Sequence, residues 1–224
     1  MDHRPAITDE PVDYINPDVP DALPRVTAPL VAATDESLAG YGFLFDDPDA
    51  VDVEIVPWPS QGWRPLDRGT GDQAGTVSGD FTFTWKGEQL WAVNDAVNDT
   101  YLSGWSRDPG QADPDAADPA RDRLLLWHAN YHPDGGQLFY PMDGCPFVTA
   151  LALPGDDVTP EKFVAFHCDG SKGLYIHPNV WHEVIIPLRP VGRFFDRQGR
   201  IHGRVSVNFP KEFGVFLEVP LPGA

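Results

Sequence analysis

The sequence predicts an all-β protein with few short helices. Its 21 glycines and 24 prolines are spread along all 224 residues, so they punctuate many short elements and do not mark one linker. Several segments alternate apolar and polar residues with a period of two, as in residues 81–85 and 205–209. The acidic residues are mostly aspartate, which favours turns and caps over helix interiors.

Strand-like segments bounded by turn residues follow one another along the chain. In order, they are residues 51–57, 80–85, 89–93, 123–127, 137–140, 147–153, 163–167, 173–177, 183–188, 204–209 and 214–219. Short helices are expected at residues 35–39, where an Asp or a Ser can cap, and at residues 159–163. In the second of these, Thr159 offers an N-cap and Pro160 suits the first helical position.

We expect one domain, residues 29–224, preceded by an extended segment, residues 1–28. That segment is rich in Pro and Asp, and Tyr14 and Ile15 can anchor it. Residues 108–122 repeat Asp-Pro and carry almost nothing apolar, so we expect a long exposed loop there, or a disordered one.

The formal charge of −18 disfavours nucleic acid and membrane surfaces as partners, because both require clustered Lys and Arg. No apolar run approaches the length of a membrane span, and the first residues lack the pattern of a targeting signal. Cys145 and Cys168 are too few for a disulfide framework. We therefore expect a cytoplasmic protein; a high-salt cytoplasm is an alternative source of the acidity.

The segment most informative about function begins near residue 128. It contains Asn130-x-His132, then four residues, Gln137, six residues and Gly144. Metal-binding β-barrel enzymes commonly show this spacing with His, His and Glu at the first three positions. Residues i and i+2 of a strand point to one face, and a hairpin brings the third side chain beside them. All three side chains can therefore face one cavity.

A second motif, residues 177–182, has the sequence His-Pro-Asn-Val-Trp-His. In such barrels a Pro-x-Gly-Val-Trp-His turn supplies the last imidazole, and Asn179 can replace Gly where the turn needs a left-handed residue. Together the two motifs resemble the cupin superfamily. The resemblance implies a cupin-like β-barrel, the double-stranded β-helix or jelly roll, in which His132 and His182 converge.

A more specific resemblance uses the same residues. The run His132-Pro133-x-Gly135-x-Gln137-x-Phe139-x-Pro141-Met142, followed by residues 148–151, 165–166 and Gly173-x3-His177-x-Asn179-Val180-Trp181-His182, looks like ureidoglycolate lyase. The match is strongest over residues 127–190. It implies a cytoplasmic enzyme of allantoin and purine catabolism, usually a homodimer, that cleaves ureidoglycolate to glyoxylate and urea.

Departures from the family pattern leave the substrate open. The family often has a carboxylate where this chain has Asn130, and a second His where this chain has Glu183. The loop at residues 108–122 and the part after Arg193 are extra to the family's compact form. The expected partner is a small carboxylated substrate.

The predicted catalytic residues are His132, His182, Gln137 and His177, although any one of these histidines can instead be structural. The two imidazoles of His132 and His182 are expected to exchange protons with the substrate. Predicted substrate-binding residues are Asn130, Arg107 and Trp181, with Arg107 holding the carboxylate; Arg204 and Lys211 are further candidate cations.

A metal held by His132, Gln137 and His182 has only neutral ligands, so we expect either no required metal or a weakly bound Ni²⁺, Mn²⁺ or Zn²⁺. Glu183, as the strand neighbour of His182, is expected to point the other way. Two other functions remain open: a metal-dependent cupin isomerase or oxygenase, and a non-catalytic protein that binds a small acid.

Overall fold

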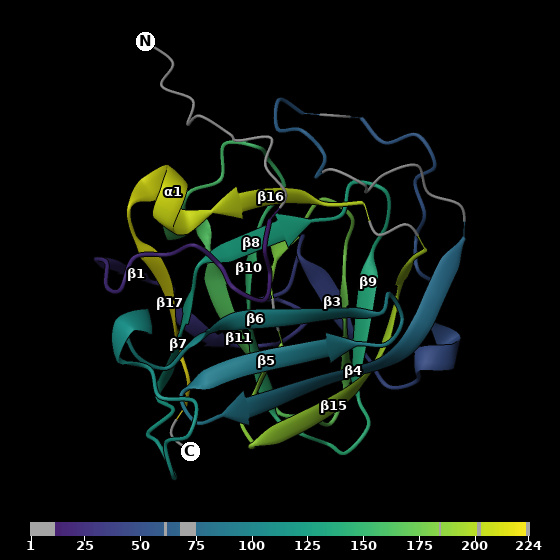
Figure 1. Cartoon of the computed structure of the whole chain (residues 1–224). Coiled ribbons are helices and arrows are strands. Elements are labelled where there is room, and N and C mark those ends of the chain that lie inside the picture. The colour runs from purple at the N-terminus through teal and green to yellow at the C-terminus, as the bar shows by residue number, and fades with distance from the viewer. Residues whose placement is uncertain (1–11, 61, 68–74, 184, 201–202, 223–224) are drawn as a thin grey trace.

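Seventeen strands form two sheets in the computed structural model, which describes residues 12–60, 62–67, 75–183, 185–200 and 203–222 (Figure 1). The larger sheet has the order β1 (Arg25–Thr27), β17 (Phe216–Pro220), β7 (Arg123–Leu126), β6 (Asp99–Trp105), β5 (Gln89–Asn94), β4 (Thr76–Lys86), β15 (Val191–Gly199), β9 (Gln137–Pro141), β12 (Gly173–Ile176) and β3 (Gly42–Phe45). The smaller sheet has the order β16 (Val205–Asn208), β8 (His128–Tyr131), β13 (Trp181–His182), β10 (Phe147–Ala152), β11 (Val164–Cys168) and β2 (Leu30–Ala32), and β14 (Ile186–Pro187) also pairs with β10.

The predicted all-β fold with few short helices is confirmed. The described residues contain one short α-helix, α1 (Phe209–Phe213), and three 3₁₀ helices, η1 (Pro48–Ala50), η2 (Pro109–Gln111) and η3 (Pro160–Lys162). Within the described part of the chain, the strands pair as two sheets, and no pairing joins them into one closed ring.

Three predicted elements are wrong in detail. Residues 51–57 form only one isolated bridge, Ile55 to Gly135, because their partner is the turn before β9 and not a strand. Residues 35–39 form turns that continue to Tyr41, and Gly40 within them has φ 86°. Among the described residues of the segment 183–188, only Ile186 and Pro187 form a strand, β14, and it ends at Pro187, which has no N–H to donate to a ladder.

One long strand, β15, was not predicted. It pairs with β4 along its whole length and with β9 on its other side. Its inward positions hold Phe194, Asp196 and Gln198, all buried. Alternation was therefore present in this segment, but two of the inward residues are polar and obscure it.

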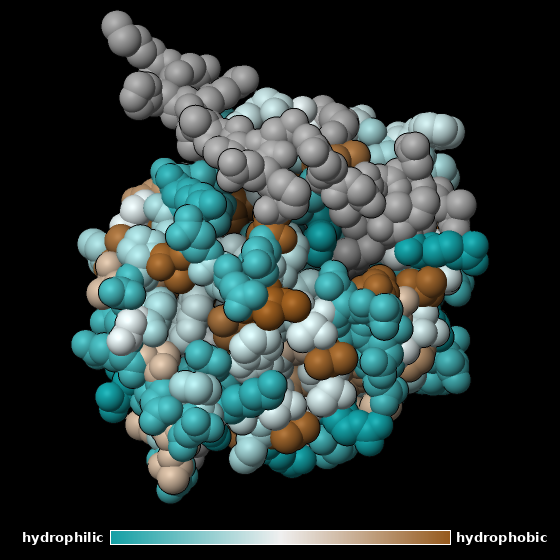
Figure 2. Space-filling view, in the orientation of Figure 1, coloured by the Kyte–Doolittle hydropathy of each residue, from teal (hydrophilic) through white to brown (hydrophobic). Residues whose placement is uncertain are grey.

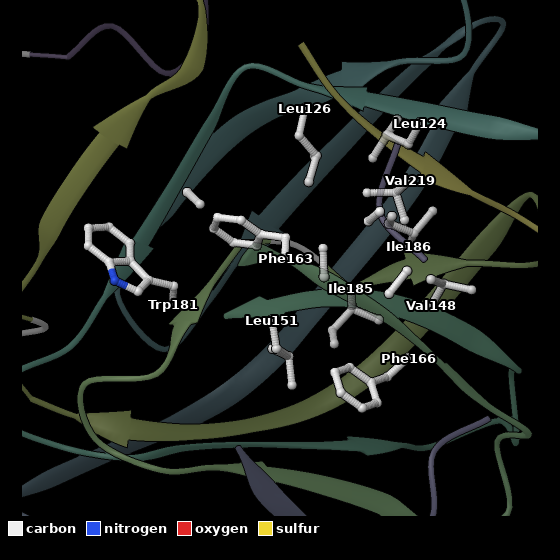
Figure 3. Packing of buried hydrophobic residues seen from close by; sticks show 14 of the residues in the cluster. Leu124, Leu126, Val148, Leu151, Phe163, Phe166, Trp181, Ile185, Ile186 and Val219 are labelled. Carbon is white, nitrogen blue, oxygen red and sulfur yellow. The ribbon is translucent and has the colours of Figure 1, made fainter. Parts of the chain in front are cut away.

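The hydrophobic core lies between the two sheets. Leu151 of β10, Phe166 of β11 and Trp181 of β13 are buried in the same cluster as Leu124, Leu126 and Val219 of the larger sheet (Figure 3). Burial of large side chains such as these stabilises each by roughly 1.5–3 kcal/mol relative to leaving it exposed. This shared core holds the two sheets together around the site described below.

Two segments expected to lie outside the core are partly ordered by it. Tyr14, in the predicted extended segment, accepts a hydrogen bond at its carbonyl from Leu102 N at 2.7 Å, and its ring contacts Tyr101 and Trp127. The loop at residues 108–122 is tied to the turn after β4, because Glu88 N donates to Asp113 O at 3.0 Å. Tyr14 therefore anchors the segment as expected, whereas the side chain of Ile15 is exposed.

The visible face of the molecule is mainly hydrophilic, with small, separate hydrophobic patches (Figure 2). The high content of Asp is consistent with this surface. None of the helices in the described residues is long and apolar enough to cross a membrane.

Candidate functional site

A pocket opens between the two sheets, and about 40 Å³ of it is accessible to the centres of water molecules. Most of the residues that line the pocket belong to pairs that lie two positions apart on one strand, because alternate side chains of a strand point to the same face. The lining residues are Tyr14, Phe81, Phe83, Ala92, Asn94, Tyr101, Ser103, His128, Asn130, His132, Gln137, Phe139, His182, Glu183 and Arg204.

Three of the predicted site residues meet at one end of this pocket. The Nε2 atoms of His132 and His182 each lie 3.2 Å from Oε1 of Gln137, and the centres of the two imidazole rings are 4.8 Å apart. All three side chains are buried. The structure therefore brings together the three residues that the two sequence motifs selected.

The turn at residues 177–180 positions His182. Asn179 has φ 67°, in the left-handed region, as the sequence predicted for the residue that replaces Gly. Its backbone N–H donates to the carbonyl of His132 at 3.0 Å. This bond joins the turn directly to the end of β8, so the second imidazole arrives beside the first.

Backbone carbonyls determine which nitrogen of each of these imidazoles carries the hydrogen. The Nδ1 atoms of His132 and His182 lie 2.8 Å from the carbonyls of Gly203 and Val180, respectively, and only Nδ1–H can bond to a carbonyl. Burial lowers the pKa of His132 to about 4 and that of His182 to about 3. Near neutral pH both rings are therefore uncharged, with the lone pair on Nε2 directed to Gln137.

A buried carboxyl group lies behind Gln137. Asp196 of β15 accepts hydrogen bonds from Gln137 Nε2 at 2.8 Å and from Asn94 Nδ2 at 3.1 Å. Burial raises the pKa of Asp196 to about 7, although both amide donors act in the opposite direction. A positive charge held by the neighbouring imidazoles and amide would favour its ionised form.

A second polar group lines the pocket beside this cluster. His128 Nδ1 lies 2.9 Å from Oε2 of Glu183, and Asn130 Nδ2 donates to the same oxygen at 3.3 Å. On its other side, His128 Nε2 lies 3.1 Å from the hydroxyl of Ser206, which donates to Asp67 at 2.6 Å. His128 is thus held between the carboxylate of Glu183 and the hydroxyl of Ser206, which is itself bound to the carboxylate of Asp67.

The expectation that Glu183 points away from His182 is wrong. Both residues line the pocket. The strict alternation of a strand does not apply, because β13 ends at His182 and Glu183 lies beyond it. The side chain of Glu183 can therefore turn back towards His128 of the neighbouring strand.

Among the described residues that line the pocket, Arg204 is the one Lys or Arg. Its guanidinium lies 4.7 Å from the centre of the Tyr14 ring and 3.7 Å from Oδ2 of Asp67, and its side chain is only 13% exposed. Burial raises the pKa of the Tyr14 phenol above its ordinary value, so the phenol keeps its hydrogen. This end of the pocket presents a guanidinium and a phenol donor.

Three predicted site residues lie elsewhere. Arg107 is exposed and pairs with Glu88 at 2.7 Å. His177 contacts the rings of Phe43 and Tyr175, and Trp181 packs on Tyr131 in the core with its Nε1 donating to the carbonyl of Gly155. None of the three lines the pocket. Asn130 does, as predicted, whereas the other candidate cation, Lys211, lies exposed on α1.

The sequence patterns did not indicate His128, Glu183 and Tyr14 as pocket residues, or Asp196 behind Gln137, and they gave Arg204 little weight. His128 precedes Asn130 and His132 by steps of two, so the period of the strand could have identified it. Asp196 lies at an inward position of β15, where an acid is unusual. The sequence offers Tyr14 as an anchor but does not place it in the pocket, because its contacts with β6 and His128 are long-range.

Comparison with known proteins identifies the part of the chain that carries this site. Residues 119–210 match the family model of ureidoglycolate lyase. The resemblance predicted from the motifs is confirmed over this segment. The segment extends past Arg193, so the expectation that the residues directly after Arg193 are extra to the family is wrong. The segment provides all the pocket residues from β8, β9 and β13, together with Arg204.

Individual relatives agree with the family match. The chain is 39% identical over 78 residues to ureidoglycolate lyase 2 of Rhizobium meliloti (strain 1021), covering 34% of this chain and 47% of that protein. It is 41% identical over 63 residues to ureidoglycolate lyase of Rhodobacter capsulatus, covering 28% and 38% of the two chains. The corresponding Escherichia coli O139:H28 protein is 36% identical over 85 residues, covering 37% and 53%.

The chain spans about half, or less, of the length of these curated relatives. The rest of the pocket wall comes from outside the ureidoglycolate lyase match. Tyr14 and the inward residues of β4, β5 and β6 form it, including Phe81, Asn94 and Tyr101.

Proposed function

We propose that this protein is a carbon-nitrogen lyase that cleaves ureidoglycolate, or a closely similar carboxylated hemiaminal, to glyoxylate and urea. One observation carries the proposal. The segment similar to ureidoglycolate lyases places its two motifs at one pocket, where buried imidazoles, a carboxylate and a guanidinium converge. Those are the groups that binding and proton transfer on such a substrate require.

Arg204 binds the carboxylate of the substrate in this proposal. A guanidinium matches a carboxylate in geometry and charge, and Arg204 lies largely, though not fully, buried in the pocket wall, where the interaction is weakly screened. The phenol of Tyr14 stacks against the guanidinium and restricts its position. Arg204 therefore takes the role that the sequence suggested for Arg107.

Glu183 and His128 move the proton. Oε2 of Glu183 is occupied by His128 and Asn130, while Oε1 receives no hydrogen bond from the described residues and is available to a ligand. Oε1 takes the proton of the substrate hydroxyl as the carbon–oxygen double bond forms and the carbon–nitrogen bond breaks. The same proton then passes to the nitrogen of the departing urea, so the carboxylate is regenerated.

His132, Gln137 and His182 bind and orient the reacting groups. With pKa values of about 4 and 3, the two imidazoles are weak bases near neutral pH, so we assign proton transfer to the His128–Glu183 pair. The mechanism remains histidine-mediated, but through a different histidine from those selected by the motifs. Asn130 fixes Glu183 through its amide.

The same three side chains fit a divalent cation. Nδ1–H of each imidazole is bound to a carbonyl, which leaves both Nε2 lone pairs and the amide oxygen of Gln137 facing one another. The described residues contain no cluster of three His, Cys, Asp or Glu side chains suited to a metal, so the third ligand here is an amide. Ni²⁺, Mn²⁺ or Zn²⁺ bound there would act as a Lewis acid towards a substrate oxygen.

The test is to incubate the purified protein with ureidoglycolate and follow glyoxylate, with and without a chelator. Turnover above the spontaneous rate, lost in a His132→Ala, His182→Ala double variant, supports the proposal. No turnover by the wild type, or full activity in the double variant, contradicts it. Ligand retained in the pocket without product indicates the binding protein considered above. Homodimerisation and a cytoplasmic location stay predictions, which sedimentation and cell fractionation can test.

A further inference from the structure

A chain of hydrogen bonds that runs from Ala96 through Asn94 and Asp196 fixes the orientation of the Gln137 amide. The backbone N–H of Ala96 donates to Oδ1 of Asn94 at 2.9 Å, and a backbone N–H can only donate. The amide nitrogen of Asn94 must therefore face Asp196, and it lies 3.1 Å from Oδ2. This contact places Asp196 as the acceptor.

The next step passes through Asp196 to Gln137. The other carboxylate oxygen of Asp196, Oδ1, lies 2.8 Å from Nε2 of Gln137 and accepts its hydrogen. Asp196 is fully buried, so water does not compete for this contact. The oxygen of the Gln137 amide, Oε1, is consequently turned towards the two imidazoles.

The other end of the chain begins at the backbone carbonyls that hold Nδ1–H of His132 and His182. A neutral imidazole has a single N–H, so its Nε2 carries a lone pair. Three acceptor atoms, two Nε2 and one Oε1, therefore face each other, with each N···O separation 3.2 Å. Imidazole nitrogens and an amide oxygen placed in this way are donors that Ni²⁺ and Zn²⁺ accept as ligands.

We propose that Asp196 is a positioning residue for a divalent cation, because it turns the oxygen of Gln137 towards His132 and His182 and supplies a buried negative charge behind them. The inference rests on the metal-holding role proposed above, but it does not depend on which reaction the protein catalyses. Asp196 itself does not touch the cation. Carboxylates that orient metal ligands in this way typically contribute 10–100-fold to metal affinity.

The experiment measures metal binding directly. Protein freed of metal by a chelator is titrated calorimetrically with Ni²⁺ and with Zn²⁺, and the visible spectrum of the Co²⁺-loaded protein reports the ligand environment. We expect the wild type to bind one equivalent and Asp196→Asn to bind at least about 10-fold more weakly. Asp80→Asn, which removes an exposed carboxylate paired with Arg193, is the matched control and should bind as the wild type does.

A double variant, Asp196→Asn with Gln137→Glu, distinguishes positioning from general structural damage. It exchanges the amide and the carboxylate between the two positions, so the amide introduced on β15 donates to the carboxylate introduced on β9 and the net charge is unchanged. We expect metal affinity to return at least to the wild-type value, with a Co²⁺ spectrum altered by the anionic ligand. Because this double variant keeps the hydrogen bond between the two positions, it can still test the positioning role if Asp196→Asn alone does not fold.

Three results would overturn the inference. They are a wild type that binds no divalent ion, an Asp196→Asn variant of unchanged affinity, and a folded double variant that does not recover binding. Failure of the proposed lyase activity is separate, since an inactive protein can still show the expected order of metal affinities.

Discussion

Oε2 of Glu183, which directly follows β13, lies 2.9 Å from Nδ1 of His128 on the neighbouring strand β8. Neither residue belongs to the set that the metal-site spacing selects. Their contact places an imidazole and a carboxylate side by side on the pocket wall, about where a substrate held by Arg204 would lie. The proposed proton transfer therefore depends on this pair.

Removing either member of the pair should lower the rate of cleavage. For His128→Gln and for Glu183→Gln we expect kcat to fall by about 10²–10⁴-fold with a smaller change in KM, the usual loss when a general acid–base group is removed. The double variant should be little worse than either single one, because the two residues act as a unit. His177→Gln, which changes a histidine outside the pocket, is the control; equal losses in all three single variants would contradict the assignment.

Arg204→Met should weaken binding of the substrate carboxylate. A hydrogen bond to a charged group contributes about 1.5–3 kcal/mol, which corresponds to an increase in KM of roughly 10–150-fold. Arg107→Met removes an exposed guanidinium bound to Glu88 and should leave steady-state kinetics unchanged. If Arg107→Met raises KM and Arg204→Met does not, the carboxylate binds as the sequence first suggested.

Asn179 should tolerate Gly but not Val. Its φ of 67° costs an ordinary L-residue about 1–2 kcal/mol, and a β-branched residue more. Asn179→Val should therefore lower the unfolding temperature and move His182 away from His132, reducing metal affinity as well. Asn179→Gly should keep the unfolding temperature and the metal affinity of the wild type. Thermal unfolding followed by circular dichroism, with metal titration of the same samples, measures the two effects.

Acidification should destabilise the metal-free protein. Between about pH 6.5 and about pH 4 the unfolded chain binds protons at His132 and His182, while the folded chain keeps those rings neutral and binds one proton at Asp196. Unfolding thus takes up one net proton from these groups, and the free energy of unfolding should fall by about 1.4 kcal/mol per pH unit as pH decreases.

Asp196→Asn provides the comparison for that pH dependence. It removes the proton that the folded state binds at Asp196, so the contribution of this cluster to the slope should rise to about 2.7 kcal/mol per pH unit. Urea unfolding in the presence of a chelator at several pH values between 4 and 6.5 gives both slopes, and other titrating groups cancel in the difference. Identical slopes would show that Asp196 is ionised throughout this range.

Sequence patterns located the part of the site that depends on local spacing. His132 and Gln137 are separated by one short turn, and His182 follows a turn whose left-handed residue can be read as Asn179. Local geometry of this kind follows from the chain itself, since the period of a strand and the conformational preference of a turn residue do not depend on distant contacts. The all-β class followed from the same kind of pattern.

Contacts between residues distant in sequence decided the rest. Arg204 and Arg107 are equivalent as isolated residues, but only Arg204 lies between Tyr14 and Asp67 in the pocket wall. Glu183 turns towards His128 because strand β13 ends before it. The protonation of the two motif histidines also depends on burial between the sheets, which no local pattern specifies.

By itself, the sequence determined the fold class, the convergence of His132, Gln137 and His182, and the resemblance to ureidoglycolate lyases. The tertiary structure decided which cation faces the pocket, which histidine has a carboxylate partner, and that Asp196 stands behind Gln137. The physical reason is the range of the interactions. Strand period and turn conformation act over a few residues, whereas desolvation and charge pairing depend on which strands the fold makes neighbours.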